Sequence, residues 1–223
     1  MTTAPVSELT LEGFRGAAAS GESVPAGVAV CAVSASFALG LLAKVVKVSG
    51  RRKGFTGDPS KAENIADAAR AESRRMLQFA EDDMAAFNAY MATSRLPQTT
   101  EREKEERKRA MDASVRKAIE MPVAAARSAA TGIGLCADAT GLVHPVVMAD
   151  LGAATALLAG GLRVFLLCAD SNIGQLATDP AIFRSVMSGR QEWESKALRQ
   201  AEVALKQVAS AIENASARQE RKP

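Results

Sequence analysis

Aromatic residues are scarce in this chain of 223 residues: they make up only 4% of it, whereas hydrophobic residues of all kinds make up 48%. A core of that composition is built from Ala, Leu, Val and Met, which favours closely packed helices over a sheet rich in β-branched and aromatic side chains. We therefore predict an all-α fold. The length suits one helical domain over residues 1–223, with a frayed tail at 219–223.

Histidine and cysteine are also rare, with one His and three Cys in the chain. Cys31, Cys136 and Cys168 lie in Ala- and Leu-rich stretches, where free thiols behave as small buried hydrophobic groups. No CxxC or Cys/His spacing indicates a zinc site, so we expect no metal. The odd cysteine count indicates a reducing compartment, and residues 1–23 lack the apolar run of a secretory signal, so we expect a cytoplasmic protein.

A strong excess of charge of one sign is missing as well. Lys and Arg number 28 and Asp and Glu number 25, and no basic stripe is interleaved with aromatic residues, so we do not expect nucleic acid as a partner. Two long apolar segments, 28–48 and 146–169, contain Lys44 and Lys47 in the first and Asp150 and Arg163 in the second. Because such charges are costly within lipid, we expect both segments to be buried by other helices and not to span a membrane.

Hydrophobic spacing, glycine and proline place the other elements. We predict helices near 7–17, 27–48, 60–93 and 100–118, a break or restart at Met121-Pro122, a glycine turn at Gly141, an apolar helix after His144-Pro145, a loop at 171–180, and one or two helices over 181–218. Within 100–118, Glu103 is spaced to pair with Arg107 and Glu105 with Arg109, which is typical of a solvated helix face.

Two adjacent aspartates interrupt the apolar stripe of the predicted 60–93 helix. Asp83 lies three residues after Ala80 and four before Phe87, so it falls on that stripe, whereas Asp82 is turned about 100° away. An inward carboxylate is either tied to a neighbouring Lys, Arg or helix N-terminus, or placed as a general base or a cation-stabilising group. The spacing alone leaves both interpretations open.

Motifs in one order along residues 7 to 215 carry a family resemblance. They are Pro25 and Gly27 before the first apolar helix, Gly50 followed by basic residues, Asp83 with "AFNAYM" at 86–91, Pro97, Met121-Pro122, and "ADLGAATALLAGGLR" at 149–163. Together they resemble the cyclodeaminase/cyclohydrolase family, which comprises the cyclodeaminase domain of formiminotransferase-cyclodeaminase and the stand-alone methenyltetrahydrofolate cyclohydrolases.

The resemblance implies a helical homodimer with a folate site near the subunit interface, in agreement with two helices too apolar for a small monomer's surface. It implies a hydrolase of one-carbon metabolism that converts 5,10-methenyltetrahydrofolate to 10-formyltetrahydrofolate without a metal or redox cofactor. The alternatives are a formiminotetrahydrofolate cyclodeaminase, which releases ammonia, and a non-catalytic folate-binding relative. The lack of an appended transferase domain favours the cyclohydrolase.

The resemblance also implies roles for individual residues. Asp83 and His144 are the expected catalytic groups, and the expected substrate-binding residues are Pro25, Gly27, Asp150, Asn172 and, for the glutamate-tail carboxylates, Arg51, Arg52 and Lys53. Arg163 is interpreted as a buried partner of Asp150 or Asp83. Where the family has a run of glycines, this chain has "PAGVAV" at 25–30, so we expect Ala26 and Val28 to narrow the approach of a ligand. Cys168 stands at a position where the family has Asn, although Asn172 remains.

Overall fold

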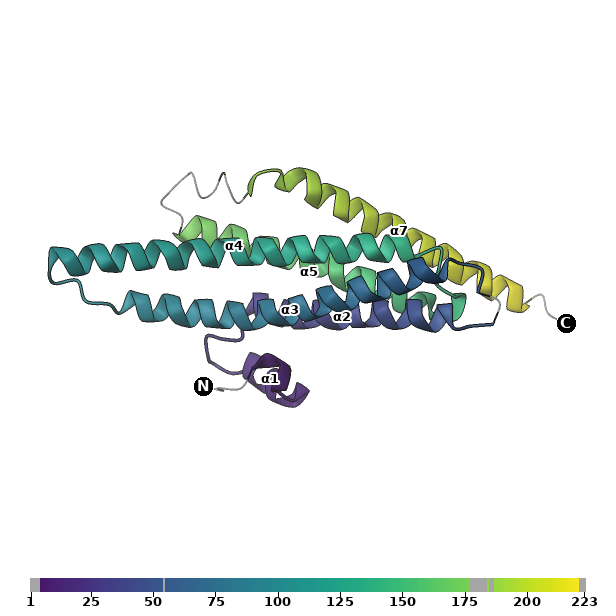
Figure 1. Cartoon of the computed structure of the whole chain (residues 1–223), viewed down its shortest axis with the longest axis horizontal. Coiled ribbons are helices and arrows are strands. Elements are labelled where there is room, and N and C mark those ends of the chain that lie inside the picture. The colour runs from purple at the N-terminus through teal and green to yellow at the C-terminus, as the bar shows by residue number, and fades with distance from the viewer. Residues whose placement is uncertain (1–4, 54, 177–183, 185–186, 221–223) are drawn as a thin grey trace. The chain divides into compact units, whose positions relative to one another are not determined.

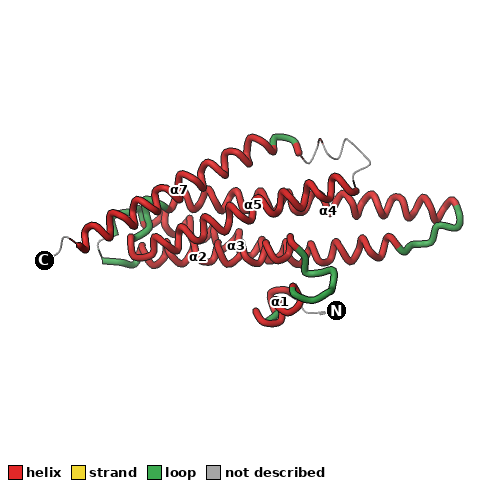
Figure 2. Tube along the Cα trace, turned by 180° about the vertical axis from the view of Figure 1, so that it is seen from behind, coloured by secondary structure: helices red, strands yellow, loops and turns green. Residues whose placement is uncertain are grey.

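The computed structural model describes residues 5–53, 55–176, 184 and 187–220, and these residues form helices and loops without a strand (Figure 2). The prediction of an all-α fold is confirmed. In chain order the elements are η1 (Val6–Glu8), α1 (Leu11–Ala18), α2 (Gly27–Gly50), α3 (Pro59–Ser94), α4 (Glu101–Ala139), η2 (Pro145–Val147), α5 (Met148–Leu176) and α7 (Arg190–Glu220). Figure 1 labels the α-helices among them.

The helix predicted near 7–17 is split into η1 and α1, and the predicted boundaries in α4 and α5 also differ from the structure. Pro122 does not end a helix, because α4 runs through it from Glu101 to Ala139. The loop predicted over 171–180 is wrong for its first part, since α5 continues to Leu176; residues 177–180 lie outside the described part of the chain. Both errors come from treating proline and polar residues as stops without knowing what packs against them.

The chain divides into two compact units. The first comprises Met1–Val33, Leu77–Ala126 and Arg163–Ser188, and the second comprises Ser34–Met76, Arg127–Leu162 and Gly189–Pro223. The single domain predicted over 1–223, with its frayed tail, stays a prediction. In the first unit, fully buried residues include Ala29, Ala80, Ile119 and Phe165, which come from α2, α3, α4 and α5 respectively.

Small residues allow helices to approach closely in the second unit. A Cβ added to Gly132 of α4 would lie 2.9 Å from Leu39 Cδ2 and 3.1 Å from Leu158 Cδ1, so α4 packs tightly against α2 and α5 there. A Cβ added to Gly152 of α5 would lie 3.0 Å from Val208 Cγ1 of α7. An alanine-rich core with few aromatic residues thus packs densely because its helices come close together.

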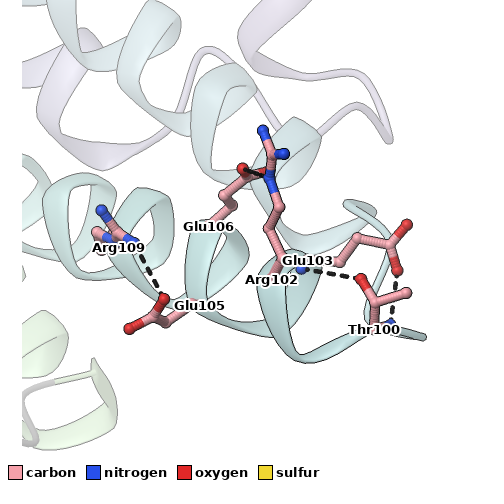
Figure 3. A network of polar contacts seen from close by, with 6 residues as sticks. All are labelled: Thr100, Arg102, Glu103, Glu105, Glu106 and Arg109. Atoms are coloured by element: carbon pink, nitrogen blue, oxygen red, sulfur yellow. Dashed lines mark hydrogen bonds and ion pairs between the residues drawn. The ribbon is translucent and has the colours of Figure 1, made fainter.

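The start of α4 is fixed by a capping box, which Figure 3 shows. Thr100 Oγ1 accepts the Glu103 N–H at 3.2 Å, and Glu103 Oε2 accepts the N–H groups of Thr99 and Thr100 at 2.9 and 2.8 Å. The predicted Glu103–Arg107 pair is therefore wrong, because Arg107 donates to Gln98 Oε1 and the Ser94 carbonyl, each at 3.0 Å. The predicted Glu105–Arg109 pair is confirmed at 3.2 Å.

Among the described residues, two helical segments have the length and composition of membrane spans, Gly27–Gly50 and Pro145–Ile173. Their most apolar windows have mean hydropathies of 2.0 and 1.8, and 61% and 50% of these windows is buried within the fold. Because burial of this kind is also typical of a core helix in a soluble protein, length and hydropathy do not favour a membrane over a helical core.

Candidate functional site

The Asp83 carboxylate lies against the first turn of α2. That helix begins at Gly27, and the preceding Ala26 has no side-chain oxygen to accept the free N–H groups of a first helical turn. The Asp83 side chain, which comes from α3, accepts a hydrogen bond from the backbone N–H of Ala29. Asp83 therefore supplies, from a second helix, an acceptor that the sequence before α2 lacks.

Burial and this hydrogen bond act in opposite directions on the pKa of Asp83. The side chain is half-buried, and the loss of hydration raises its pKa to about 6, although the Ala29 N–H favours the charged form. No Lys or Arg of the described residues forms an ion pair with Asp83. A carboxyl group of this pKa, free of a basic partner, is suited to take up and return a proton near neutral pH.

Asp82, the neighbouring acid, has different surroundings. Its Oδ1 accepts a hydrogen bond from Gln78 Nε2 at 3.1 Å, one turn earlier on the exposed surface of α3. It has no contact with the first turn of α2 of the kind that Asp83 makes. The two side chains therefore face in different directions, as the spacing along α3 predicts.

Cys168 of α5 lies beside Asp83 and Gly27. A Cβ added to Gly27 would lie 3.6 Å from Cys168 Sγ, and the pKa of Cys168 is raised, first by burial and then by the negative charge of Asp83. Burial, with a smaller effect of Cys168, also raises the pKa of Cys31 to about 11. Both thiols therefore carry their protons at neutral pH and are poor nucleophiles.

The predicted narrowing of the 25–30 segment is only partly right. Val28 is 5% exposed, so its side chain packs into the core and does not narrow the approach of a ligand. Ala26 and Gly27 are exposed, while Pro25 is buried. Because an added Cβ at Gly27 would make only an ordinary contact with Cys168, this position does not require glycine for steric reasons.

Asn172 has a structural contact that its predicted substrate-binding role did not include. Pro122 has no N–H, so the carbonyl of Ala118, four residues earlier in α4, lacks its usual helical donor. Asn172, which belongs to α5, donates a hydrogen bond from Nδ2 to that carbonyl oxygen, with a length of 2.8 Å. This side-chain hydrogen bond explains how α4 continues through a proline. It uses only the Nδ2 group of Asn172, so the Oδ1 atom is still able to accept a hydrogen bond.

His144 is held by its backbone and by its ring at the start of η2, in the second unit. Its N–H donates to Ser49 Oγ at 2.8 Å, and Ser49 Oγ in turn donates to the Val45 carbonyl at 2.7 Å. The ring Nδ1 accepts the Val146 N–H at 3.2 Å, so the neutral imidazole carries its proton on Nε2. Its predicted catalytic role stays a prediction, and the structure adds a capping role.

The three predicted tail-binding residues do not line one pocket. Arg51 lies with Lys47 in a pocket of about 290 Å³ between the end of α2 and the start of α3. Arg52 lies with His144 in a separate pocket of about 150 Å³. Lys53 is exposed and lines neither of them. Their assignment to a glutamate tail stays a prediction, in which Arg51 and Arg52 would reach different groups.

Asp150, the acid in the first turn of α5, has a lysine partner. Lys44 Nζ of α2 lies 3.2 Å from Asp150 Oδ2, and the Asp150 side chain is 39% exposed. The expected partner Arg163 is an exposed residue thirteen positions further along α5, so its interpretation as a buried partner was wrong. The Lys44 pair and the helix N-terminus account for Asp150 structurally, and its substrate role stays a prediction.

A profile of the family described as Formiminotransferase-cyclodeaminase matches residues 10–192. The chain belongs to this family. Among solved structures, it is similar to the formiminotetrahydrofolate cyclodeaminase of Thermotoga maritima, with 19% identity over 95% of this chain and 99% of that chain and a TM-score of 0.77, a likeness that supports the fold. Among curated proteins, none matches.

For this member of the formiminotransferase-cyclodeaminase family, the structure brings together two pairs of predicted site residues, one pair in each unit. Asp83 and Gly27 lie together in the first unit, and Arg52 and His144 share a pocket in the second. Sequence reasoning offered a helix N-terminus as one possible partner of Asp83, but it did not identify the Ala29 N–H of α2 as that partner. The lack of a side-chain cap at Ala26 was the available signal for this contact. The position of Cys168 beside Asp83 was missed. Within the described ranges, no group of three His, Cys, Asp or Glu side chains is arranged to hold a metal.

Proposed function

We propose that the chain is a one-carbon folate enzyme that closes the formimino group of formiminotetrahydrofolate into a ring and releases ammonia. The observation that carries this proposal is the half-buried Asp83 carboxylate, with its pKa raised to about 6, in a chain of this family. The family match and the name of the structural relative favour this activity over the methenyltetrahydrofolate cyclohydrolase that the sequence alone favoured.

The reaction needs one proton to move from one nitrogen to another. The ring-forming nitrogen attacks the formimino carbon, a C–N bond forms, and that nitrogen loses a proton. The formimino nitrogen gains a proton, its bond to carbon breaks, and it leaves as ammonia. A single carboxylate can take the first proton and return it to the leaving nitrogen, which is most effective when its pKa is near the working pH. Asp83 has that property.

The same carboxylate has an electrostatic role in the proposed reaction. The protonated formimino group and the ring-closed product are both amidinium cations. A negative charge that is half-buried acts through a lower effective dielectric constant than one in water, so it stabilises a nearby cation more strongly. Asp83 is free of Lys and Arg partners among the described residues, so its charge is available to such a cation.

Two assays with the purified full chain test the proposal. With formiminotetrahydrofolate, we expect ammonia release and a rise of the near-ultraviolet absorbance that corresponds to one methenyl product for each ammonia. With methenyltetrahydrofolate alone, we expect its absorbance to decay at the spontaneous rate. Faster decay without ammonia release from the formimino compound would replace the proposal with the cyclohydrolase. Binding of both compounds without turnover would establish a non-catalytic relative.

The pH dependence follows from Asp83. Its raised pKa means that the carboxylate, the form required as base, is dominant above about pH 6 in the free protein. We therefore expect kcat/KM for ammonia release to be level above that pH and to fall about tenfold per unit below it. A profile of kcat/KM between pH 4.5 and about 8, with protein stability followed in parallel, measures this. A profile that is flat through pH 6 would contradict the role of Asp83 as base.

We also propose that the chain forms a homodimer through apolar residues exposed on α2 and α5. On α2, Val30 of the first unit is 38% exposed and Phe37 of the second unit is 58% exposed. On α5, Leu157 of the second unit is 49% exposed, and Val164 and Leu167 of the first unit are 36% and 67% exposed. Large exposed side chains of this kind, on helices otherwise used for the core, are typical of an association surface.

Light scattering gives the test of the dimer. We expect a mass near twice 23.3 kDa, and a shift towards the monomer in Phe37→Glu and Leu167→Glu. Val203→Glu, at a 54% exposed apolar position on α7, is the matched control and should leave the mass unchanged. A monodisperse monomer of the unmodified chain would refute the proposal.

A further inference from the structure

A groove between α4 and α7 in the second unit is lined by none of the site residues assigned above. One face of α4 contributes Arg127 and Thr131, and one face of α7 contributes Trp193, Lys196 and Gln200, around a pocket of about 280 Å³. The spacings of four residues on α4 and of three and seven on α7 place these side chains on single helix faces. We call this pocket the Arg127 groove.

The positive charges of the Arg127 groove are not balanced by any carboxylate of the described residues. Neither Arg127 nor Lys196 forms an ion pair with a carboxylate of the described residues. Glu194, the acid next to Trp193 in sequence, is bound by Arg190, with 3.0 Å between Glu194 Oε2 and Arg190 Nε. Among the described residues, the groove therefore has two basic side chains and the amide of Gln200, and none of its described lining residues is a carboxylate.

Arg127 is also held in position. Its guanidinium carbon lies 4.8 Å from the centroid of the Trp193 ring, a cation–π arrangement. Stacking on the indole restricts the Arg127 side chain but leaves the N–H groups at the edge of the guanidinium able to donate. Because the side chain is already restricted, it loses less conformational freedom on binding an oxyanion than an unstacked arginine would. Thr131 Oγ1 donates to the Arg127 carbonyl at 3.1 Å, so the hydroxyl proton is used within α4.

The indole of Trp193 gives a second, independent observation. Its Nε1 is buried and has no acceptor among the described residues. Buried N–H donors usually have an acceptor, and an unpaired one calls for an explanation. A ligand with oxygen atoms would bring hydrogen-bond acceptors to a groove that contains two cations, Arg127 and Lys196, and the unpaired Trp193 N–H donor.

We propose that the Arg127 groove binds a small oxyanion, carried as a carboxylate or a phosphate group. The anion accepts hydrogen bonds from the Arg127 guanidinium, in its fork geometry, and from the Lys196 ammonium, with the Gln200 amide as a further donor. None of the residues of this groove takes part in the proposed reaction, which uses Asp83 of the first unit. Its test therefore does not depend on whether the chain releases ammonia.

The chain itself contains a reporter for this test, because Trp193 is its only tryptophan. Glutarate and inorganic phosphate are titrated separately into the full chain at constant ionic strength, balanced with chloride, while tryptophan fluorescence is recorded. An anion that engages Arg127 changes the contact between guanidinium and indole, so we expect a saturable change. A response to glutarate alone identifies a carboxylate site, and a response to phosphate alone identifies a phosphate site.

Variants separate a site from general attraction to positive charge. We expect Arg127→Gln and Lys196→Gln each to raise the dissociation constant about tenfold or more, as loss of a charge-assisted hydrogen bond does. Arg199→Gln removes the same charge from an exposed position of α7 that does not line the groove, and it should leave the constant within about twofold of the original value. Calorimetric titration provides the constant for Arg127→Gln, whose fluorescence is altered from the start.

Circular dichroism establishes whether each variant is folded. If Arg127→Gln does not fold, Lys196→Gln still decides the test, because Lys196 is exposed and has no ion pair within the described chain. The proposal is overturned if neither probe gives a saturable response in the unmodified chain. It is equally overturned if Arg199→Gln weakens binding as much as Lys196→Gln does, since the anion would then respond only to net charge.

Discussion

Asp83→Asn is expected to lower kcat for ammonia release by about 10²–10⁴-fold, the usual contribution of a positioned proton-transfer group. The replacement is nearly isosteric, and the amide oxygen can still accept the Ala29 N–H, so the first turn of α2 keeps its acceptor. What is lost is the negative charge next to the proposed cation and the ability to take up a proton. The loss should therefore appear in turnover while the fold is retained.

Asp82→Asn is the matched control, because it makes the same chemical change one residue away. Asp82 bonds to Gln78 on the exposed surface of α3, so we expect less than about a tenfold loss in kcat. Thermal midpoint and oligomeric state are measured for both variants before activity. If folded Asp83→Asn turns over like the unmodified protein, Asp83 is not the base, and inactivity of Asp82→Asn alone would show that the roles of the two aspartates are reversed.

Asn172→Ala is expected to lower the free energy of unfolding by about 1–3 kcal/mol, which corresponds to as much as about a 150-fold change in the unfolding constant. The Ala118 carbonyl would lose the donor that reaches it at 2.8 Å, and Pro122 cannot replace that donor. Urea unfolding followed by circular dichroism gives the measurement. A lower midpoint urea concentration, with an unchanged slope of the unfolding free energy against urea, would show that the stability changed and the surface exposed on unfolding did not.

Pro122→Ala supplies the control for this explanation. It restores an N–H at residue 122, which can bond to the Ala118 carbonyl as in an ordinary helix. In that background we expect Asn172→Ala to cost much less, so the double-mutant cycle should show a coupling between the two positions. Equal costs in both backgrounds would mean that Asn172 stabilises the protein through some other contact.

Hydrophobic periodicity predicted the main helices because it depends on local spacing, which the sequence contains in full. The α3 stripe is an example: Ile65, Ala69, Met76 and Ala80 are all buried, as their spacing requires, whereas Phe87, further along the same stripe, is only partly buried. Pro122 shows the limit of local reasoning. A proline ends a helix unless another side chain satisfies the freed carbonyl, and that side chain, Asn172, is 50 residues away in sequence.

The candidate site shows the same limit. The position of Asp83 on the inner stripe of α3 follows from its spacing, but its partner, the first turn of α2, is brought to it only by packing. Arg51, Arg52 and Lys53 are adjacent in sequence, and adjacency suggested a shared role. At the end of α2, however, the chain turns, and successive side chains enter different pockets or solvent. Direction at a turn depends on backbone angles that composition does not fix.

The hydrogen bond from Ala29 has an electrostatic consequence for how firmly a cation is held beside Asp83. The N-terminal end of a helix such as α2 carries the equivalent of about half a positive charge, which the Asp83 carboxylate partly offsets. A cation next to this carboxylate is therefore attracted less strongly than it would be by an isolated buried anion. In the proposed reaction the product is a cation like the substrate, so this weaker attraction would favour its departure and limit inhibition by accumulated product.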